Sequence, residues 1–321
     1  YTDNGKNFYY DSSSMAHHLD QDPGRQASPL IPQDPRLAFI CQLIDEAFDE
    51  FGLYMVHHMR WVGSAQTTPM GKMTAREFRR LLPPGFEPLL ARRLYRRQVS
   101  RCPYLFSVAP QGYDAGVARD RTPPSRPGFP PTHALLDEAW RRYLAAMEHL
   151  LANQPYLLGG RFTLADASAY GQLGMNLVDP QAIAQLELLA PNTFRWLCAI
   201  RDGRQGEHGR ADLALTSSLK PLLRIITSTL VALMRQNEKA YEHAVADGET
   251  VFNEAAFDRH RALYDGHLLG HPFRAVAKTF QVRVWRELKE SWQALDVQDR
   301  KSLEQELLPD AGITFSPDNA L

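Results

Sequence analysis

Residues 157–166 read Leu157-Leu158-Gly159-Gly160-Arg161-Phe162-Thr163-Leu164-Ala165-Asp166 and carry the strongest folding signal of the chain. A glycine pair typical of a turn precedes Thr163, and Asp166 follows three residues after it. The Thr163 hydroxyl can accept a hydrogen bond from the backbone N–H of Asp166, while the Asp166 carboxylate accepts one from the N–H of Thr163. This capping box predicts that a helix begins directly after Thr163.

The helix after Thr163 is predicted to be buried, because small side chains let neighbouring backbones approach closely. Its small residues are Ala165, Ala167, Ser168, Ala169, Gly171 and Gly174. The pattern Leu-x-Gly-x-x-x-Thr-x-Ala-Asp, which runs from Leu157 to Asp166, resembles the N-capping box of the core helix in the C-terminal domain of glutathione S-transferases. We interpret Thr163 and Asp166 as structural capping residues.

Asp11 and Ser12 are the best candidates for binding a cofactor or co-substrate. They open a predicted helix in Asp11-Ser12-Ser13-Ser14-Met15-Ala16-His17-His18-Leu19-Asp20. A helix N-terminus offers unpaired N–H groups to a carboxylate, and a nearby Asp can hold an ammonium group. The pattern resembles the acid-Ser motif of glutathione transferases, with Met15 where Ile is usual, and this implies glutathione as co-substrate. The residues alone leave open that this stretch only caps a helix.

Composition excludes several classes of protein. The chain has 321 residues, 44% of them hydrophobic, and 36 basic against 37 acidic side chains. A whole-chain charge near zero predicts no nucleic-acid and no membrane partner, unless a local patch supplies one. Its three cysteines form no CxxC pair, so we expect no metal and a reducing, cytoplasmic setting. The longest apolar run, 225–234, is interrupted by polar residues, so no membrane span is expected.

We predict a mainly α fold, a glutathione transferase C-terminal-like helical bundle. The resemblance divides the chain into three parts: 1–29, a remnant of a thioredoxin-like α/β domain; 30–202, the helical domain with an insertion at 63–131; and 203–321, a mostly helical extension. The first ten residues look like a hairpin. We expect sequence upstream of them to carry the residue that activates the glutathione sulfur, which leaves the catalytic residue unknown.

Periodicity places the individual elements. Asp34-Pro35 starts a helix that reaches Val62, and its acidic side is expected to be solvated. That side carries Asp45, Glu46, Asp49 and Glu50. Further helices are predicted from a Thr74-Ala75-Arg76-Glu77 capping box, from Pro88, and over 133–152, 181–189 and 191–200. Two long helices, marked by Leu222 to Tyr241 and by Val276 to Leu295, flank a hairpin predicted to turn at Asp265-Gly266.

The long helix that starts at Asp34-Pro35 also holds the candidate pocket residues. In glutathione transferases this helix lines the pocket for the electrophile, so Tyr54 and His58 are the predicted substrate-pocket residues. His57 and His58 cannot both face one pocket, because successive helical residues point about 100° apart. The arginines between Arg92 and Arg101 are interpreted as a solvated helix face, with phosphate contact as the alternative.

The functional expectation follows from the resemblance. It implies a glutathione transferase-like protein that joins glutathione to a small electrophilic molecule when intact, and that forms a homodimer. The alternative is a non-catalytic binding or assembly module with the same fold, because the insertion and the extension add surface without adding an obvious reactive residue.

Overall fold

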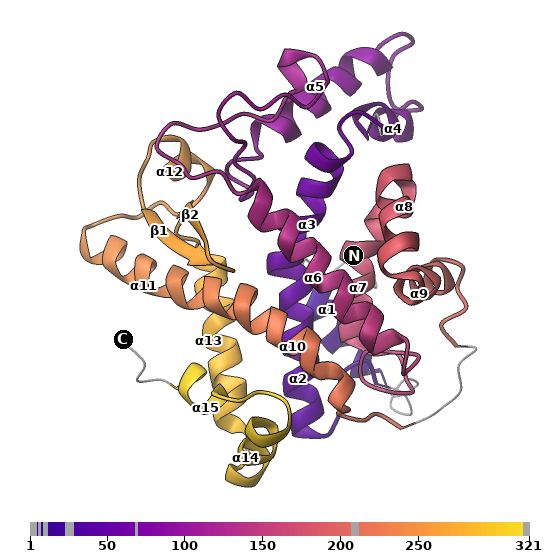
Figure 1. Ribbon diagram of the computed structural model, residues 1–321, viewed down its shortest axis with the longest axis vertical. Coiled ribbons are helices and arrows are strands. Elements are labelled where there is room, and N and C mark those ends of the chain that lie inside the picture. The colour runs from indigo at the N-terminus through magenta and orange to yellow at the C-terminus, as the bar shows by residue number, and fades with distance from the viewer. Residues whose placement is uncertain are drawn as a thin grey trace.

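The structure is a computed structural model that describes Gly5, Phe8 and residues 12–22, 29–67, 70–206 and 212–316. Figure 1 shows a helical protein with one small β-hairpin at its side, as the sequence predicts. Helix α1 (Ser12–Asp20) is the first described element of secondary structure. The hairpin predicted for the first ten residues lies outside the described residues, apart from Gly5 and Phe8.

One long helix runs through the centre of the protein from Pro35 to Gly63. It consists of α2 (Pro35–Glu46), the π-helical η2 (Ala47–Gly52), α3 (Leu53–His58) and the π-helical η3 (Met59–Gly63). The Asp34 carboxylate caps it by accepting the N–H groups of Arg36 and Leu37. The predicted start is therefore confirmed. The π-helical segments were not predicted, and they change which way the following side chains point.

Four further helical segments complete the bundle, the last of them packing on the other three. They are α6 (His133–Leu151), α7 (Leu164–Leu173) with the 3₁₀ segment η5 (Gly174–Val178), α8 (Pro180–Leu189) and α9 (Pro191–Arg201). Their bounds lie within a residue or two of the predicted ones. Ala165 and Ala169 of α7 are completely buried, so the small-residue helix is in the core, as predicted.

The capping box of α7 is present. Both halves of the reciprocal Thr163–Asp166 pair form, and the Asp166 Oδ2 atom lies 2.9 Å from the Thr163 backbone nitrogen. The other carboxylate oxygen, Oδ1, accepts the N–H of Leu157 at 2.9 Å. Asp166 therefore caps the helix and also fixes the turn that precedes it.

The insertion forms a helical hairpin of α4 (Met70–Glu77) and α5 (Glu87–Ser100), followed by a loop that contains the 3₁₀ turn η4 (Arg119–Arg121). The helix predicted from Pro88 is confirmed by α5. The prediction that Thr74 starts a helix was wrong, because Thr74 to Glu77 form the last part of α4. A Thr-x-x-Glu spacing also occurs inside helices, where the backbone donors are already paired.

The extension begins by pairing with the glycine turn before α7. The N–H of Gly160 donates to the Asp212 carbonyl and the N–H of Ala214 donates to the Leu158 carbonyl. Gly159, with φ at +104°, allows this approach, because a Cβ there would lie 2.9 Å from the Ala214 nitrogen. Gly159, within the glycine turn of residues 157–166, is thus also the point at which the extension contacts the bundle.

The rest of the extension is helical apart from one hairpin. In chain order it contains η6 (Ser217–Leu219), α10 (Lys220–Ile226), the π-helical η7 (Thr227–Val231), α11 (Ala232–Ala246), α12 (Glu254–Asp258), β1 (Leu263–Leu268), β2 (His271–Val276), α13 (Thr279–Ala294), α14 (Val297–Glu306) and α15 (Ala311–Thr314). Both predicted long helices are present, although Val276 belongs to β2 and not to the second of them.

The predicted hairpin exists, but its turn was placed wrongly. Strands β1 and β2 pair antiparallel with Leu268 opposite His271, so the chain reverses at Leu269-Gly270, where both residues have positive φ. Gly266 lies within β1 opposite Phe273, and a Cβ there would meet the Phe273 ring at 2.4 Å. The Asp-Gly pair therefore marks a close contact, not the turn.

The extension and the bundle share one hydrophobic core. Phe39 of α2 contacts Trp292 of α13, with ring centroids 5.2 Å apart, and the Phe315 ring lies 5.3 Å from Phe39. Tyr143 of α6 shares a hydrogen bond of 2.9 Å with Thr229 of η7. Helices α10 and α13 therefore complete the packing of the bundle (Figure 1).

Among the described residues, one helix meets the length and composition of a membrane span, whereas the sequence was expected to contain no span. It is the continuous helical segment Ser217–Ala246, and 56% of its most apolar window is buried inside the protein. Such burial is typical of a core helix, and length and composition alone are weak evidence for a span.

Candidate functional site

Helix α1 is attached to the bundle by a buried carboxylate. The Ser13 hydroxyl donates to Asp45 Oδ2 at 2.8 Å, and the Ser168 hydroxyl of α7 donates to Asp45 Oδ1. Asp45 itself is only 2% exposed. At the other end of α1, the Asp20 carboxylate accepts the N–H groups of Leu30 and Ile31. These contacts fix the position of α1 on α2 and α7.

The sequence predicts a glutathione-binding site at the start of α1. Ser12 is the first residue of α1, and its side chain is not among the described ones. Asp11 lies outside the described residues. The glutathione-binding role of Asp11 and Ser12 therefore stays a prediction. The structure shows only where the helix that follows Asp11 lies.

A cavity of about 870 Å³ lies between α1, the long central helix and α13. Its volume is in the range typical of small-molecule sites. The side chains that line it include Ser13, Ser14, His17, Cys41, Asp45, Glu46, Asp49, Glu50, Gln172, Phe280, Arg283 and Glu287. The cavity therefore adjoins the helix on which the predicted glutathione site lies.

The walls of this cavity are strongly acidic. The acidic side of the long helix was predicted to be solvated, and that prediction was wrong, because α1 and α13 cover it. Burial, together with the neighbouring Asp45 and Glu50 carboxylates, raises the pKa of Glu46 to about 9. Burial also raises the pKa of Glu50. Glu46 is consequently protonated at neutral pH and can donate a hydrogen bond into the cavity.

The raised pKa of Glu46 predicts a pH-dependent stability. The folded protein keeps this proton between about pH 4.5 and pH 9 while the unfolded chain loses it, so stability falls as the pH rises through this window. We expect Glu46→Gln to remove this loss and to be more stable than the wild type by about 2 kcal/mol at pH 9. Urea unfolding at pH 5, 7 and 9 measures the difference. Glu290→Gln, which replaces an exposed glutamate on α13, is the control, and an equal dependence of stability on pH in the two variants would contradict the prediction.

No thiol of the described cavity wall is ready to react. Cys41 lines the cavity, and burial raises the pKa of its thiol to about 12, so it is neutral at physiological pH. A neutral thiol is a poor nucleophile. The cavity as described can bind a molecule and orient it, and a reactive sulfur would have to come from the ligand.

Tyr54 lies in a buried polar cluster with the extension. Lys278 Nζ donates to the Tyr54 hydroxyl at 2.6 Å, and Gln281 Nε2 donates to it at 3.0 Å. Burial raises the pKa of Tyr54 and lowers the pKa of Lys278. Tyr54 is only 3% exposed and is not among the residues that line the cavity beside α1. Its contacts are those of a residue that joins the long helix to α13.

His58 lines a different cavity, of about 520 Å³, near the start of α6. Its Nδ1 atom lies 2.8 Å from the Ser107 hydroxyl, and its Nε2 atom lies 3.3 Å from Asp137. This resembles a Ser-His-Asp arrangement, but Ser107 is completely buried and cannot reach a substrate. The neighbouring His133 packs on His58, and burial lowers the pKa of His133 to about 3.

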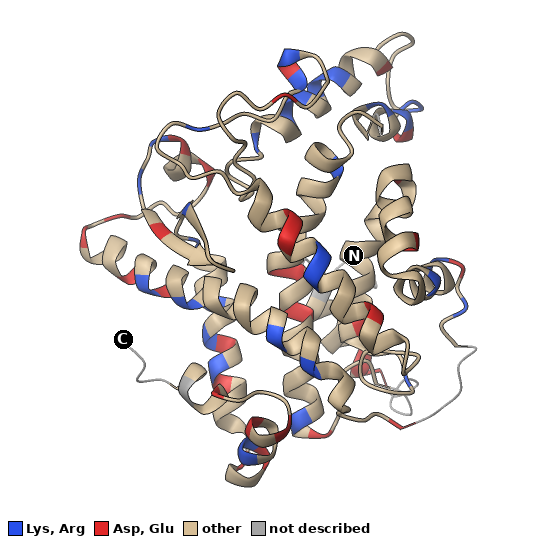
Figure 2. Cartoon of the chain, in the orientation of Figure 1, with Lys and Arg blue, Asp and Glu red and all other residues tan. Residues whose placement is uncertain are grey.

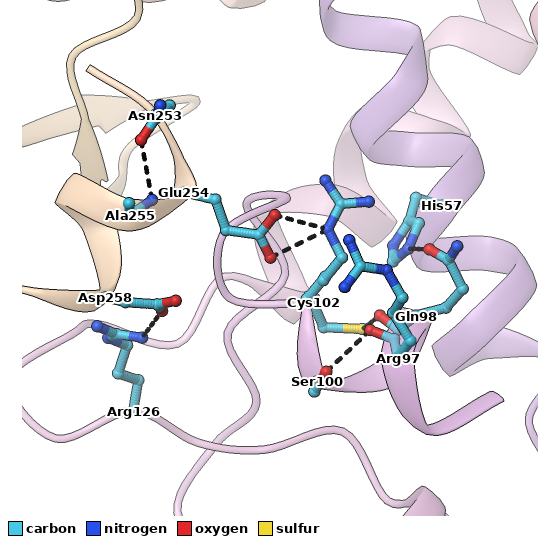
Figure 3. A network of polar contacts seen from close by, with 11 residues as sticks. His57, Arg97, Gln98, Ser100, Cys102, Arg126, Asn253, Glu254, Ala255 and Asp258 are labelled. Carbon is cyan, nitrogen blue, oxygen red and sulfur yellow. Dashed lines mark hydrogen bonds and ion pairs between the residues drawn. The ribbon is translucent and has the colours of Figure 1, made fainter. Parts of the chain in front are cut away.

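His57 points to another neighbour, as helix geometry requires. Figure 3 shows its ring directed at Gln98 of α5, and the two side chains are 3.4 Å apart. Burial lowers the pKa of His57 to about 4, so it is neutral at physiological pH. The structure therefore separates the predicted pocket residues Tyr54 and His58 and brings neither to the cavity at α1.

The family comparison fits this arrangement of helices. Residues 110–197 match the family model described as glutathione S-transferase, C-terminal domain, and they span α6 to α9 with the capped helix α7 among them. Residues 110–197 thus carry the sequence pattern of a glutathione S-transferase C-terminal domain. Searches of curated proteins and of solved structures gave no match. The match covers the last part of the insertion and ends within α9.

Sequence reasoning missed the side of the cavity that the extension of this glutathione S-transferase-like chain supplies. Arg283 and Glu287 of α13 line it, yet in the sequence they look like ordinary surface residues of an amphipathic helix. Arg283 and Glu287 are four residues apart and form a weak ion pair. In the sequence this spacing indicates a helix, but it does not indicate a cavity.

Proposed function

We propose that this chain is part of a glutathione transferase-like protein that binds glutathione at the start of α1 and a small electrophile in the adjoining acidic cavity. The observation that carries this proposal is the attachment of α1 through Ser13 and Asp45, which places a helix N-terminus beside a cavity of suitable size. Asp11 would hold the ammonium group of the glutamyl end, and the N-terminus of α1 its carboxylate.

The charge of the cavity narrows the class of electrophile. Its carboxylates oppose an anion, whereas the neutral Glu46 donates a hydrogen bond. Neutral carbonyl-containing or cationic electrophiles match these walls. Glutathione sulfur would attack the electrophilic carbon, and the protein would contribute orientation and exclusion of water.

Isothermal titration calorimetry with reduced glutathione tests the binding site. We expect Asp11→Ala to weaken binding at least about tenfold, because one charge-assisted contact is worth about that much. Asp247→Ala, at the exposed end of α11, should bind as the wild type does. Circular dichroism checks that each variant is folded. Equal affinity of the Asp11→Ala variant and the wild type would refute the assignment.

The second candidate is a binding or assembly module without catalysis. It is favoured by one observation: the helical hairpin of the insertion exposes large apolar side chains, among them Leu81 and Leu89, as a surface for a partner would. Turnover of an aryl halide with glutathione separates the two: binding without turnover supports the module. A homodimer and a cytoplasmic location belong to the same proposal, and the three free cysteines fit a reducing compartment.

A further inference from the structure

The helical hairpin of the insertion has a well-packed inner side. Gly71 of α4 lies so close to α5 that a Cβ there would be 2.6 Å from the Ala91 carbonyl oxygen. Met70, Tyr95 and Val99 are buried between the helices and η3. The turn at residues 83–86 closes with a hydrogen bond from the Phe86 N–H to the Pro83 carbonyl. The hairpin is therefore an ordered element and not a loose loop.

Its tip exposes large apolar side chains that no described segment covers. Phe78 is 45% exposed, Leu81 is 81% exposed, Phe86 is 52% exposed and Leu89 is 62% exposed. These four residues lie within twelve positions of the sequence, whereas most other exposed large apolar residues are scattered along the chain. A contiguous apolar patch on a protein surface marks a site of interaction.

The same hairpin is the most basic part of the chain. Residues 70–101 contain nine basic and two acidic side chains, a net charge of +7, while the whole chain has a net charge of −1. Figure 2 shows this concentration of blue on α4 and α5. Arg79, Arg80 and Arg93 are exposed and form no ion pair with any described residue. Their charge is thus available to a partner.

The apolar and the basic residues share one side of α5. Phe86, Leu89 and Arg93 follow one another at spacings of three and four, which places them on one face. Ala91, Tyr95 and Val99 form the opposite, inward face. The outer face therefore presents an apolar end next to positive charge.

The hairpin is anchored at its base and along α5, where Arg92 and Arg96 pair with Asp120 of η4. Figure 3 shows Gln98 near the end of α5 joined to His57, and Glu254 of α12 beside the same end of α5. The carboxylate of Glu254 accepts a hydrogen bond from Arg101 at 3.1 Å. The tip at residues 78–89 lies at the far end, where the hairpin projects from the bundle (Figure 1).

We propose that the outer face of the α4–α5 hairpin docks on an anionic lipid bilayer. Lipid headgroups attract the arginines, and the exposed Phe and Leu side chains enter the boundary between headgroups and acyl chains. Nucleic acid would use the arginines for its phosphates, and such backbone contacts leave the apolar tip in water. This local patch is the exception that the expectation from the charge of the whole chain allowed, and it is independent of the glutathione site.

Flotation of the full chain with vesicles tests the proposal. We expect binding to phosphatidylcholine vesicles with about one-third phosphatidylserine and none to pure phosphatidylcholine vesicles. The triple variant Arg79→Gln, Arg80→Gln, Arg93→Gln should bind about a hundredfold more weakly, since each arginine near such a surface contributes about fivefold. The double variant Leu81→Ser, Phe86→Ser should bind at least about tenfold more weakly at the same salt concentration.

Matched controls use exposed residues elsewhere. Leu188→Ser on α8, where the side chain is 80% exposed, and Arg224→Gln with Arg259→Gln should leave vesicle binding unchanged. Circular dichroism confirms that the variants fold, which is expected because the substituted side chains are exposed. Two outcomes overturn the proposal: absence of vesicle binding by the wild type, or binding to duplex DNA and to vesicles that is equally insensitive to Leu81→Ser, Phe86→Ser.

Discussion

Trp292→Ala is expected to destabilise the whole protein by about 4 kcal/mol, in a single unfolding transition. The side chain is 2% exposed and packs against Phe39 of α2 and Phe315, with centroids 5.2 Å and 5.6 Å away. Truncation leaves a large cavity between the extension and the central helix. Because the extension and the bundle share one hydrophobic core, the loss of stability affects both parts.

Urea unfolding followed by two probes measures this effect. Far-ultraviolet circular dichroism reports all helices, while tryptophan fluorescence includes Trp140 and Trp196 of the bundle. The two curves should coincide for the wild type and for the variant. Val297→Ala, at a position that is 59% exposed on α14, should change stability by less than about 0.5 kcal/mol. Separate transitions for the extension and the bundle would show that the core is not cooperative.

Asp166→Ala is expected to cost about 4 kcal/mol of unfolding free energy, more than an ordinary helix cap. The carboxylate accepts the N–H of Leu157, the N–H of Thr163 and the Thr163 hydroxyl, and it is completely buried. Burial raises the pKa of Asp166 to about 6 against the effect of these donors, so it is ionised at pH 7. Alanine leaves the donors buried without partners.

Comparison with Asp34→Ala separates capping from burial. Asp34 caps α2 through two backbone N–H groups, but its side chain is 39% exposed, so water can replace it. We expect a cost of about 1 kcal/mol there. Asp166→Asn, which keeps one acceptor oxygen, should lie between the two alanine variants. If Asp34→Ala and Asp166→Ala lowered the free energy of unfolding by similar amounts, the buried hydrogen bond between Asp166 and the turn at Leu157 would contribute nothing to stability.

Local signals predicted most of the helices, because capping residues and apolar spacing act within a few residues. Asp34-Pro35, Thr163 with Asp166, and Pro191 all start helices where the sequence indicates. The same local rules failed at Thr74, where the Thr-x-x-Glu spacing lies inside a helix, and at Asp265-Gly266, where the deciding contact comes from the neighbouring strand. Gly266 is required by the ring of Phe273 on the neighbouring strand, and no local pattern carries that information.

The candidate site was less predictable, because its walls come from segments far apart in sequence. The acidic residues Asp45 and Glu46 look like a solvated face until α13, more than two hundred residues later, covers them. Tyr54 has its polar partners on the extension for the same reason. Sequence motifs predicted the fold and the helix next to which the glutathione site is proposed. They could not predict the burial and the charge of the cavity, because these depend on tertiary structure.

The docking of the extension at Gly159 also bears on how the chain folds during synthesis. Residues 212–316 supply part of the core of helices that were synthesised earlier, so the ribosome needs about 5 to 20 seconds to complete it. During that interval Phe39 and its neighbours face water or a chaperone. The core of the bundle is therefore completed late, and its dependence on chaperones should increase when translation of residues 212–316 is slowed.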